Sequence, residues 1–223
     1  MDNKNFLSHS IIAHRGIYNN ITIFENTLES VMYAVKNNLS IEIDVRFTSD
    51  EEIIVFHDDD GSRMLKLKDN INSLTKEDID YLSNYHIPTL EEILNIVNGK
   101  VPIIIEVKED NKKFRKKLIN ILKRYNGDFA IESFIYDAVK YYKKKKYIVG
   151  LLVGMKKNRG LLNKRLDLDF IAIKYNSLDR REINSLKSKY YLIGWTVDNR
   201  SDAEEYIRLY NNLIIDNIEE VFK

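Results

Sequence analysis

The sequence contains no cysteine and only two prolines among its 223 residues. The absence of cysteine excludes disulfide bonds and thiolate metal sites. No apolar run approaches the ~20 residues that a helix needs to cross a bilayer. The first residues, MDNKNFLSHS, also lack the apolar core of a signal peptide. We therefore expect a cytoplasmic protein without stable membrane insertion.

The sequence also lacks an excess of charge of either sign. Lysine and arginine number 35 and aspartate and glutamate 34, which gives a net charge of +1. This balance provides no electrostatic argument for a nucleic-acid partner. The most biased stretch, KYYKKKKY at 140–147, is interpreted as a solvated helix end rather than as a patch for anionic lipid. No surface stripe marks a subunit interface, and a homodimer is left open.

Short apolar runs that alternate with amphipathic stretches dominate the chain. Strand and helix in alternation favour parallel strands joined by helical crossovers. Eight strand-like runs in a chain of this length predict a (β/α)8 TIM-type barrel, as one domain over residues 1–223. The runs are 10–16, 41–48, 101–108, 129–134, 147–154, 170–176, 191–197 and 213–218.

One further strand, EIIVFHD at 52–58, follows its predecessor too closely for a helical crossover. We therefore expect an antiparallel β-hairpin over about residues 41–58, at the active-site mouth of the barrel. If the turn consists of two residues, Asp50 and Glu51, then Asp44 faces His57 across the hairpin.

Charged residues interrupt two of the most apolar strands, IEIDV and IIIEVK. Because side chains alternate along a strand, Glu42 and Asp44 share one face, and so do Glu106 and Lys108. A carboxylate is costly to bury unless it is paired or binds metal. Two interpretations stay open. The three carboxylates form an oxygen site for Mg²⁺ or Ca²⁺, or Glu106 and Lys108 form an interior ion pair.

Two of the four histidines, His14 and His57, stand at the ends of apolar strands. Two histidines on either side of a reacting bond can act as general base and general acid. Arg15 can bind a phosphate oxygen in a bidentate manner, and Lys108 offers a second cation. Together with a divalent cation, these groups describe metal-assisted cleavage of a phosphodiester.

Six motifs in order resemble the glycerophosphodiester phosphodiesterases, which belong to the phospholipase C-like phosphodiesterase superfamily. The motifs are AHRG (13–16), ENT (25–27), EIDVRFTSDEEIIVFHD (42–58), IPTLEEIL (87–94), IIIEVK (103–108) and WTVDN (195–199). The resemblance implies a TIM-type barrel and an enzyme that releases sn-glycerol 3-phosphate and an alcohol from a small glycerophosphodiester. The route it implies uses the substrate's own 2-hydroxyl as nucleophile, through a cyclic phosphate.

The resemblance also implies roles for nine residues. His14 and His57 would be the acid/base pair, and Arg15 and Lys108 would contact the phosphate. Glu42, Asp44 and Glu106 would hold the divalent cation. Glu25 would lie at the substrate site and orient His14 or Arg15, and Trp195 would line the substrate pocket.

The sequence departs from the family pattern in two places. Phe24 precedes the ENT motif where the family usually has proline, which would fix φ. The segment 59–86, which often caps the pocket in the family, is short. Two alternative functions therefore stay open: a lysophospholipase D, which an apolar rim of Phe47, Phe56 and Met64 would favour, and a non-catalytic barrel that binds phosphodiesters.

Overall fold

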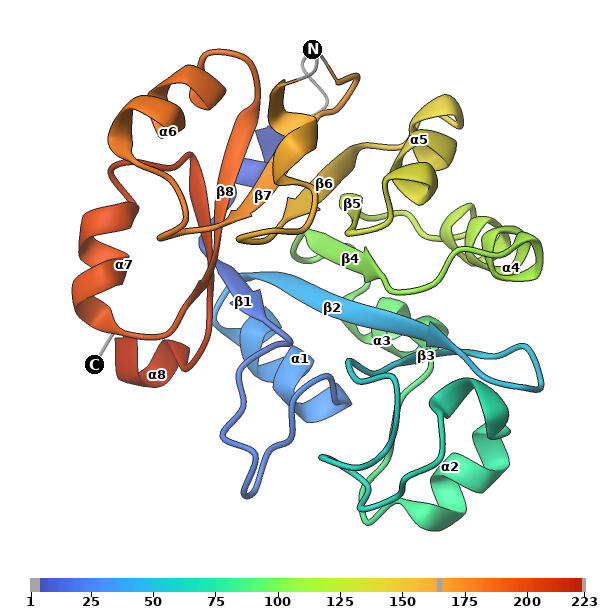
Figure 1. Ribbon diagram of the computed structural model, residues 1–223. Helices are drawn as coiled ribbons and strands as arrows, with labels where there is room; N and C mark the ends of the chain where they lie inside the picture. The colour runs from blue at the N-terminus through green and yellow to red at the C-terminus, as the bar shows by residue number, and fades with distance from the viewer. Residues whose placement is uncertain (1–4, 164–165, 222–223) are drawn as a thin grey trace.

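The computed structural model describes residues 5–163 and 166–221, and it shows the predicted barrel. Eight parallel strands pair in the order β1-β9-β8-β7-β6-β5-β4-β2, and β1 pairs with β2 to close the ring (Figure 1). The strands are β1 Ile12–His14, β2 Ser40–Phe47, β4 Ile103–Val107, β5 Phe129–Ser133, β6 Val149–Val153, β7 Phe170–Lys174, β8 Tyr191–Val197 and β9 Asn212–Ile215. Each coincides with one of the eight predicted runs.

Helices surround the strands, and only the short helix α2 lies apart from this ring (Figure 1). The helices are α1 Leu28–Lys36, α2 Lys76–Leu82, α3 Leu90–Val97, α4 Lys112–Leu122, α5 Tyr136–Lys144, α6 Arg180–Lys187, α7 Arg200–Tyr206 and α8 Ile218–Val221. None of the helices in the described part of the chain combines the length and apolar character needed to cross a membrane.

Alternation along the strands divides the interior into two cores. In β2 the residues Ile41, Ile43 and Val45 face the helices and join the larger core. The residues between them point into the barrel lumen. The part of the lumen nearer the amino ends of the strands is filled by a second apolar cluster that includes Ile104, Leu152, Phe170, Ile193 and Ile214. The buried acidic residues of the lumen, Glu42, Asp44, Glu106 and Glu132, lie nearer the carboxyl ends of the strands, where barrels of this type carry their active sites.

The extra strand β3, Ile53–Val55, pairs antiparallel with β2 and forms the expected hairpin. The prediction of a two-residue turn is wrong. The Thr48 amide donates to the Glu52 carbonyl oxygen, so three residues form the turn, and Glu51 has a φ of 68°. This left-handed residue adds one position to the turn. Asp44 is consequently opposite Phe56, whose amide donates to its carbonyl oxygen, rather than opposite His57.

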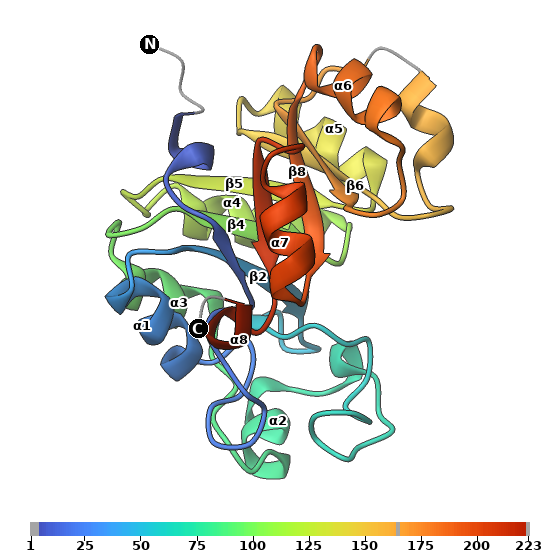
Figure 2. The same ribbon diagram turned by 90° about the vertical axis from the view of Figure 1, so that its left-hand side faces the viewer.

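The segment between β3 and α3 folds over the hairpin and packs on a small apolar cluster of its own that includes Phe56 and Ile79. With the loop after β1 it projects from the barrel on one side, toward the bottom of both ribbon views (Figure 2). The ring of Phe24 stacks on Tyr85 of this segment, with centroids 4.2 Å apart. The aromatic contact fixes the loop at the position where the family's proline is missing.

We predict that Gly150→Ala destabilises the barrel. A Cβ atom at Gly150 would lie 2.1 Å from the ring of Phe170, which is fully buried in the lumen. Overpacking of this kind costs about 1–3 kcal/mol, or roughly 2–4 °C in Tm per kcal/mol for a chain of this size. The control is Gly160→Ala, where a Cβ atom meets nothing within 4 Å. Equal melting temperatures for the two variants would contradict this account of the lumen.

Candidate active site

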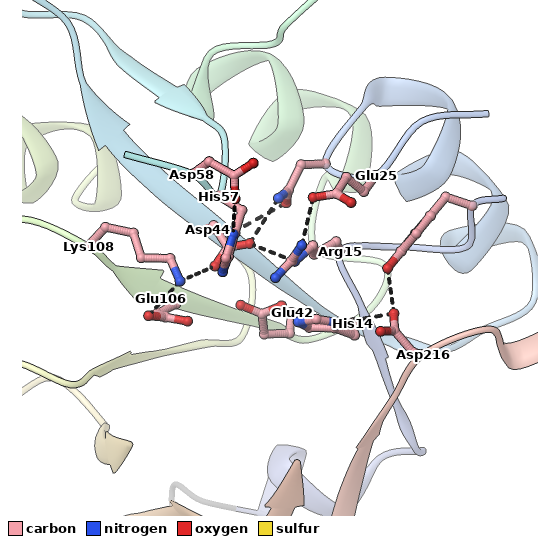
Figure 3. Close-up of polar contacts among 12 residues, drawn as sticks. His14, Arg15, Glu25, Glu42, Asp44, His57, Asp58, Glu106, Lys108 and Asp216 are labelled. Carbon is pink, nitrogen blue, oxygen red and sulfur yellow. Dashed lines mark hydrogen bonds and ion pairs between the residues drawn. The ribbon is translucent and has the colours of Figure 1, made fainter. Parts of the chain in front are cut away.

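The predicted site residues converge on a cavity of about 110 Å³ at the carboxyl ends of the strands. His14 is the last residue of β1, Glu42 lies on β2 and Glu106 on β4, while His57 follows β3. The predicted residues that line the cavity are His14, Arg15, Glu42, His57, Glu106, Lys108 and Trp195. Asp44 and Glu25 do not line the cavity and instead contact the residues that do. Figure 3 shows how the polar side chains point toward one another.

Three carboxylates meet at the centre of the site. Glu42, Asp44 and Glu106 each place one oxygen within 4.8 Å of the others, and all three are buried. Lys108 Nζ lies 2.8 Å from an oxygen of Asp44 and 2.8 Å from one of Glu106. Asn26, from the ENT motif, donates to Asp44 Oδ2 at 2.9 Å. The interior ion pair and the oxygen cluster, which the sequence offers as alternatives, are thus both present.

Burial and mutual repulsion shape the titration of these carboxylates. Burial, together with the charges of Asp44 and Glu106, raises the pKa of Glu42 well above its usual value. Burial and Asp44 raise the pKa of Glu106 to about 7, against the opposing effect of Lys108. Burial acts in the same direction on Asp44, but Lys108 and Arg15 outweigh it and hold its pKa well below the ordinary range. The raised pKa values mean that the protein's own cations do not keep all three carboxyl groups ionised near neutral pH.

Each site histidine has its own carboxylate at Nδ1. His14 Nδ1 lies 3.0 Å from Asp216 Oδ1, and His57 Nδ1 lies 2.6 Å from Asp58 Oδ1. Tyr18 also donates to Asp216, at 2.5 Å. A carboxylate at Nδ1 keeps the proton there and leaves Nε2 free to accept or deliver a proton. His14 Nε2 is 3.9 Å from Glu42 Oε2, so this nitrogen points toward the acidic cluster.

The chain turns sharply after His14. Arg15 and Gly16 have φ angles of 57° and 83°, and a Cβ atom at Gly16 would lie 2.6 Å from the carbonyl carbon of Ser30. Glycine is therefore required at position 16. The turn lets helix α1 approach β1 closely and directs the Arg15 side chain across the site.

Arg15 is held by two carboxylates. Its Nη1 donates to Glu25 at 2.7 Å, and its Nε lies 3.1 Å from Asp44 Oδ2. Glu25 also accepts two hydrogen bonds from Arg63, at 2.6 and 2.8 Å, and Arg63 Nε donates to Asp58 at 2.7 Å. Burial alone would raise the pKa of Glu25, but Arg63 and Arg15 lower it to about 2. One continuous network thus joins Arg15 to the carboxylate that holds His57.

A family-wide sequence model, described as the glycerophosphoryl diester phosphodiesterase family, matches residues 14–219. The chain belongs to this family. It is therefore an enzyme, a glycerophosphodiester phosphodiesterase, as the resemblance predicts.

Named relatives support the assignment to the phosphodiesterases. The glycerophosphodiester phosphodiesterase of Caldanaerobacter subterraneus subsp. tengcongensis is 26% identical over 219 residues, which cover 89% of each chain. The solved phosphodiesterase of Thermotoga maritima has a TM-score of 0.81 at 25% identity and covers 95% of this chain and 96% of its own. A phosphodiesterase of Oleispira antarctica, solved with the product sn-glycerol-3-phosphate, has a TM-score of 0.80 at 20% identity and covers 93% and 92%.

Three charged residues that hold the site histidines and Glu25 are absent from the sequence-based expectation. Asp58 directly follows His57 in the quoted FHD motif, and Asp216 stands where the last predicted strand, LIIDNI, ends at the mouth of the barrel. The sequence therefore indicates that both aspartates lie near the site. The role of Arg63 could not be predicted, because nothing in the sequence of the irregular segment after β3 indicates that this arginine contacts Glu25.

We predict that Arg63→Gln slows turnover without unfolding the phosphodiesterase. The substitution removes the bonds that fix Glu25 and Asp58, and a hydrogen bond to a charged group contributes about 1.5–3 kcal/mol, so kcat should fall about 10-fold or more. Arg180→Gln is the matched control, since the exposed Arg180 pairs with surface Glu205 at 3.3 Å. Steady-state kinetics and Tm distinguish the outcomes. A kcat equal to that of the control would show that Arg63 does not position the site.

Proposed function

We propose that the protein hydrolyses glycerophosphodiesters to sn-glycerol 3-phosphate and an alcohol, with a divalent cation and two histidines as acid and base. One observation carries this proposal. His14 and His57, each bound at Nδ1 by an aspartate, stand beside a buried cluster of three carboxylates in one cavity. The product bound in the solved relative of Oleispira antarctica supports the same choice of substrate.

The carboxylate cluster fits a divalent cation. Neither oxygen of the buried Glu42 has a hydrogen-bond partner among the described residues. Unpartnered buried carboxylate oxygens are costly unless a cation binds them. All three candidate ligands offer oxygen, which suits Mg²⁺ or Ca²⁺ rather than zinc. When bound by Glu42, Asp44 and Glu106, such an ion would polarise a phosphoryl oxygen and neutralise developing charge.

The remaining steps belong to side chains of the cavity wall. Arg15 and Lys108 bind the phosphate oxygens. One histidine Nε2 takes the proton of the 2-hydroxyl as that oxygen bonds to phosphorus. The other histidine gives a proton to the alcohol oxygen as its bond to phosphorus breaks. Water then opens the resulting cyclic phosphate, and the two histidines exchange roles.

A lysophospholipase D is the second candidate, because a human lysophospholipase D is 29% identical over 142 residues. That match covers 56% of this chain and 44% of the human one. The predicted apolar rim argues against this candidate. Phe47 is 6% exposed and belongs to the larger core. Phe56 is 3% exposed and belongs to the small cluster after β3, against which the half-buried Met64 packs. They form no exposed surface for an acyl chain.

The proposal predicts metal-dependent release of glycerol 3-phosphate. The protein is incubated with glycerophosphocholine, glycerophosphoethanolamine and a lysophosphatidylcholine, with Mg²⁺, with Ca²⁺ and with a chelator, and the product is measured enzymatically. We expect turnover of the two deacylated diesters in the presence of either or both ions. Turnover in chelator would contradict the metal, preference for the lysophospholipid would favour the second candidate, and binding without turnover would contradict catalysis.

Metal binding is measured separately, so that the ligand assignment does not depend on activity. Titration calorimetry of Mg²⁺ or Ca²⁺ into the unmodified protein should give binding that Glu42→Gln weakens. Glu91→Gln is the control, because Glu91 is an exposed carboxylate paired with Arg124 on the surface. Equal affinities in the two variants would show that Glu42 is not a ligand.

The histidines provide a separate prediction. His14→Ala and His57→Ala should each lower kcat by about 10²-fold or more, because general acid–base catalysis contributes that much. His86→Ala is the control, since His86 is exposed and pairs with Glu92 and Asp80 on the surface. Full activity in either site variant would show that the acid/base assignment is wrong.

A further inference from the structure

Two unpartnered polar atoms lie in the wall of the active-site cavity, outside the group of three carboxylates. Oε2 of Glu132 and Nε1 of Trp195 are both buried and have no hydrogen-bond partner among the described residues. Both residues line the same cavity of about 110 Å³. One atom accepts a hydrogen bond and the other donates one. Buried groups of this kind are normally satisfied, so the pair requires a partner that the protein does not supply.

Glu132 occupies its position because of the strand register. It lies on β5, directly opposite Glu106 of β4, and is only 1% exposed. The group whose oxygens share one centre nevertheless consists of Glu42, Asp44 and Glu106 and does not include Glu132. A cation held by those three carboxylates would therefore leave Glu132 Oε2 unsatisfied.

Trp195 is held in place by an aromatic neighbour. Phe134 lies two residues after Glu132 and meets the Trp195 ring edge-to-face, with centroids 5.6 Å apart. The floor beside them is apolar, formed by Leu152 and Ile214. Thr196 also lines the cavity beside Trp195, but on this side the buried atoms without a partner among the described residues are those of Glu132 and Trp195.

We infer that Glu132 and Trp195 form a subsite for a hydroxyl group of the substrate, the one on the glycerol carbon farthest from phosphorus. The hydroxyl hydrogen is donated to Glu132 Oε2, and the hydroxyl oxygen accepts from Trp195 Nε1. This inference rests on the proposed function, in which the 2-hydroxyl is reserved for attack on phosphorus. The third glycerol oxygen is then the group left to satisfy both atoms.

The subsite selects deacylated substrates. In a lysophospholipid acylated at the distal oxygen, that oxygen carries an acyl group in place of its hydrogen and cannot donate to Glu132. The cavity is also far smaller than the roughly 300–1,000 Å³ of pockets that hold drug-sized ligands. A site built to hydrogen-bond a substrate hydroxyl strongly rejects analogues that lack it, because its polar groups are left unpaired.

The test compares two diesters that differ in one hydroxyl. Glycerophosphocholine is compared with the choline diester of propane-1,2-diol 1-phosphate, which keeps the neighbouring hydroxyl and lacks the distal one. For the unmodified protein we expect kcat/KM to be about 10-fold or more higher for glycerophosphocholine, the effect of leaving a buried polar group without its hydrogen-bond partner. In Glu132→Leu and in Trp195→Phe this ratio should fall toward 1.

Glu132→Gln is the conservative variant, because its amide keeps a carbonyl oxygen of similar reach. It should retain most of the discrimination, which separates loss of the hydrogen bond from loss of folding. Melting temperatures are recorded for all three variants. If Glu132→Leu does not fold, the kcat/KM ratios of Trp195→Phe and Glu132→Gln still test the hydroxyl subsite.

The outcomes separate this inference from the proposed function. If the unmodified protein hydrolyses neither diester, the proposed function fails. If it hydrolyses both with a ratio near 1, only the hydroxyl subsite is overturned. An unchanged ratio in Glu132→Leu, accompanied by weaker Mg²⁺ or Ca²⁺ binding in calorimetry, would also overturn it, and would place Glu132 with the metal ligands.

Discussion

The site is organised by negative charge that is buried where the strands end. Four carboxyl groups, from Glu42, Asp44, Glu106 and Glu132, lie in one polar layer of the lumen, and Asp44 is fully buried. Lys108 and Arg15 are the cations within contact distance of Asp44, and both contribute to its low pKa. Two cations cannot balance four carboxylates. Some of these carboxyl groups are therefore protonated unless a further cation binds them.

Balancing this charge requires parts of the chain that are distant in sequence. Arg15 can face Asp44 only because Glu25 holds its other side, and Glu25 in turn is shared with Arg63. Arg63 belongs to the segment after β3, while Arg15 and Glu25 flank the loop after β1. The network therefore fixes two loops against each other. Through Asp58 it also reaches the imidazole of His57, so charge balance and histidine orientation depend on the same contacts.

Local pattern was sufficient to predict the barrel, its hairpin and the polar layer of the lumen. Strand alternation alone places Glu42 and Asp44 on one face, and the parallel register brings Glu106 beside Asp44. The hairpin register could not be predicted, because it depends on the left-handed Glu51 in the turn. The partner of His14 could not be predicted, because the end of the last strand places Asp216 at the barrel mouth without indicating that its side chain meets His14, 202 residues away.

Glu132 follows the same pattern as the predicted carboxylates, a single acidic residue in an apolar strand, FAIES. It differs in what surrounds it. Glu106 has Lys108 within 2.8 Å, whereas Oε2 of Glu132 has no hydrogen-bond partner in the described chain. A buried carboxyl oxygen that has no hydrogen-bond partner and lies outside the proposed metal site is a cost to folding. A substrate group that both donates and accepts a hydrogen bond can satisfy Glu132 and Trp195 together, and a hydroxyl is such a group. Recognition of the substrate thus depends on the same burial that makes these two polar groups costly to leave unpaired.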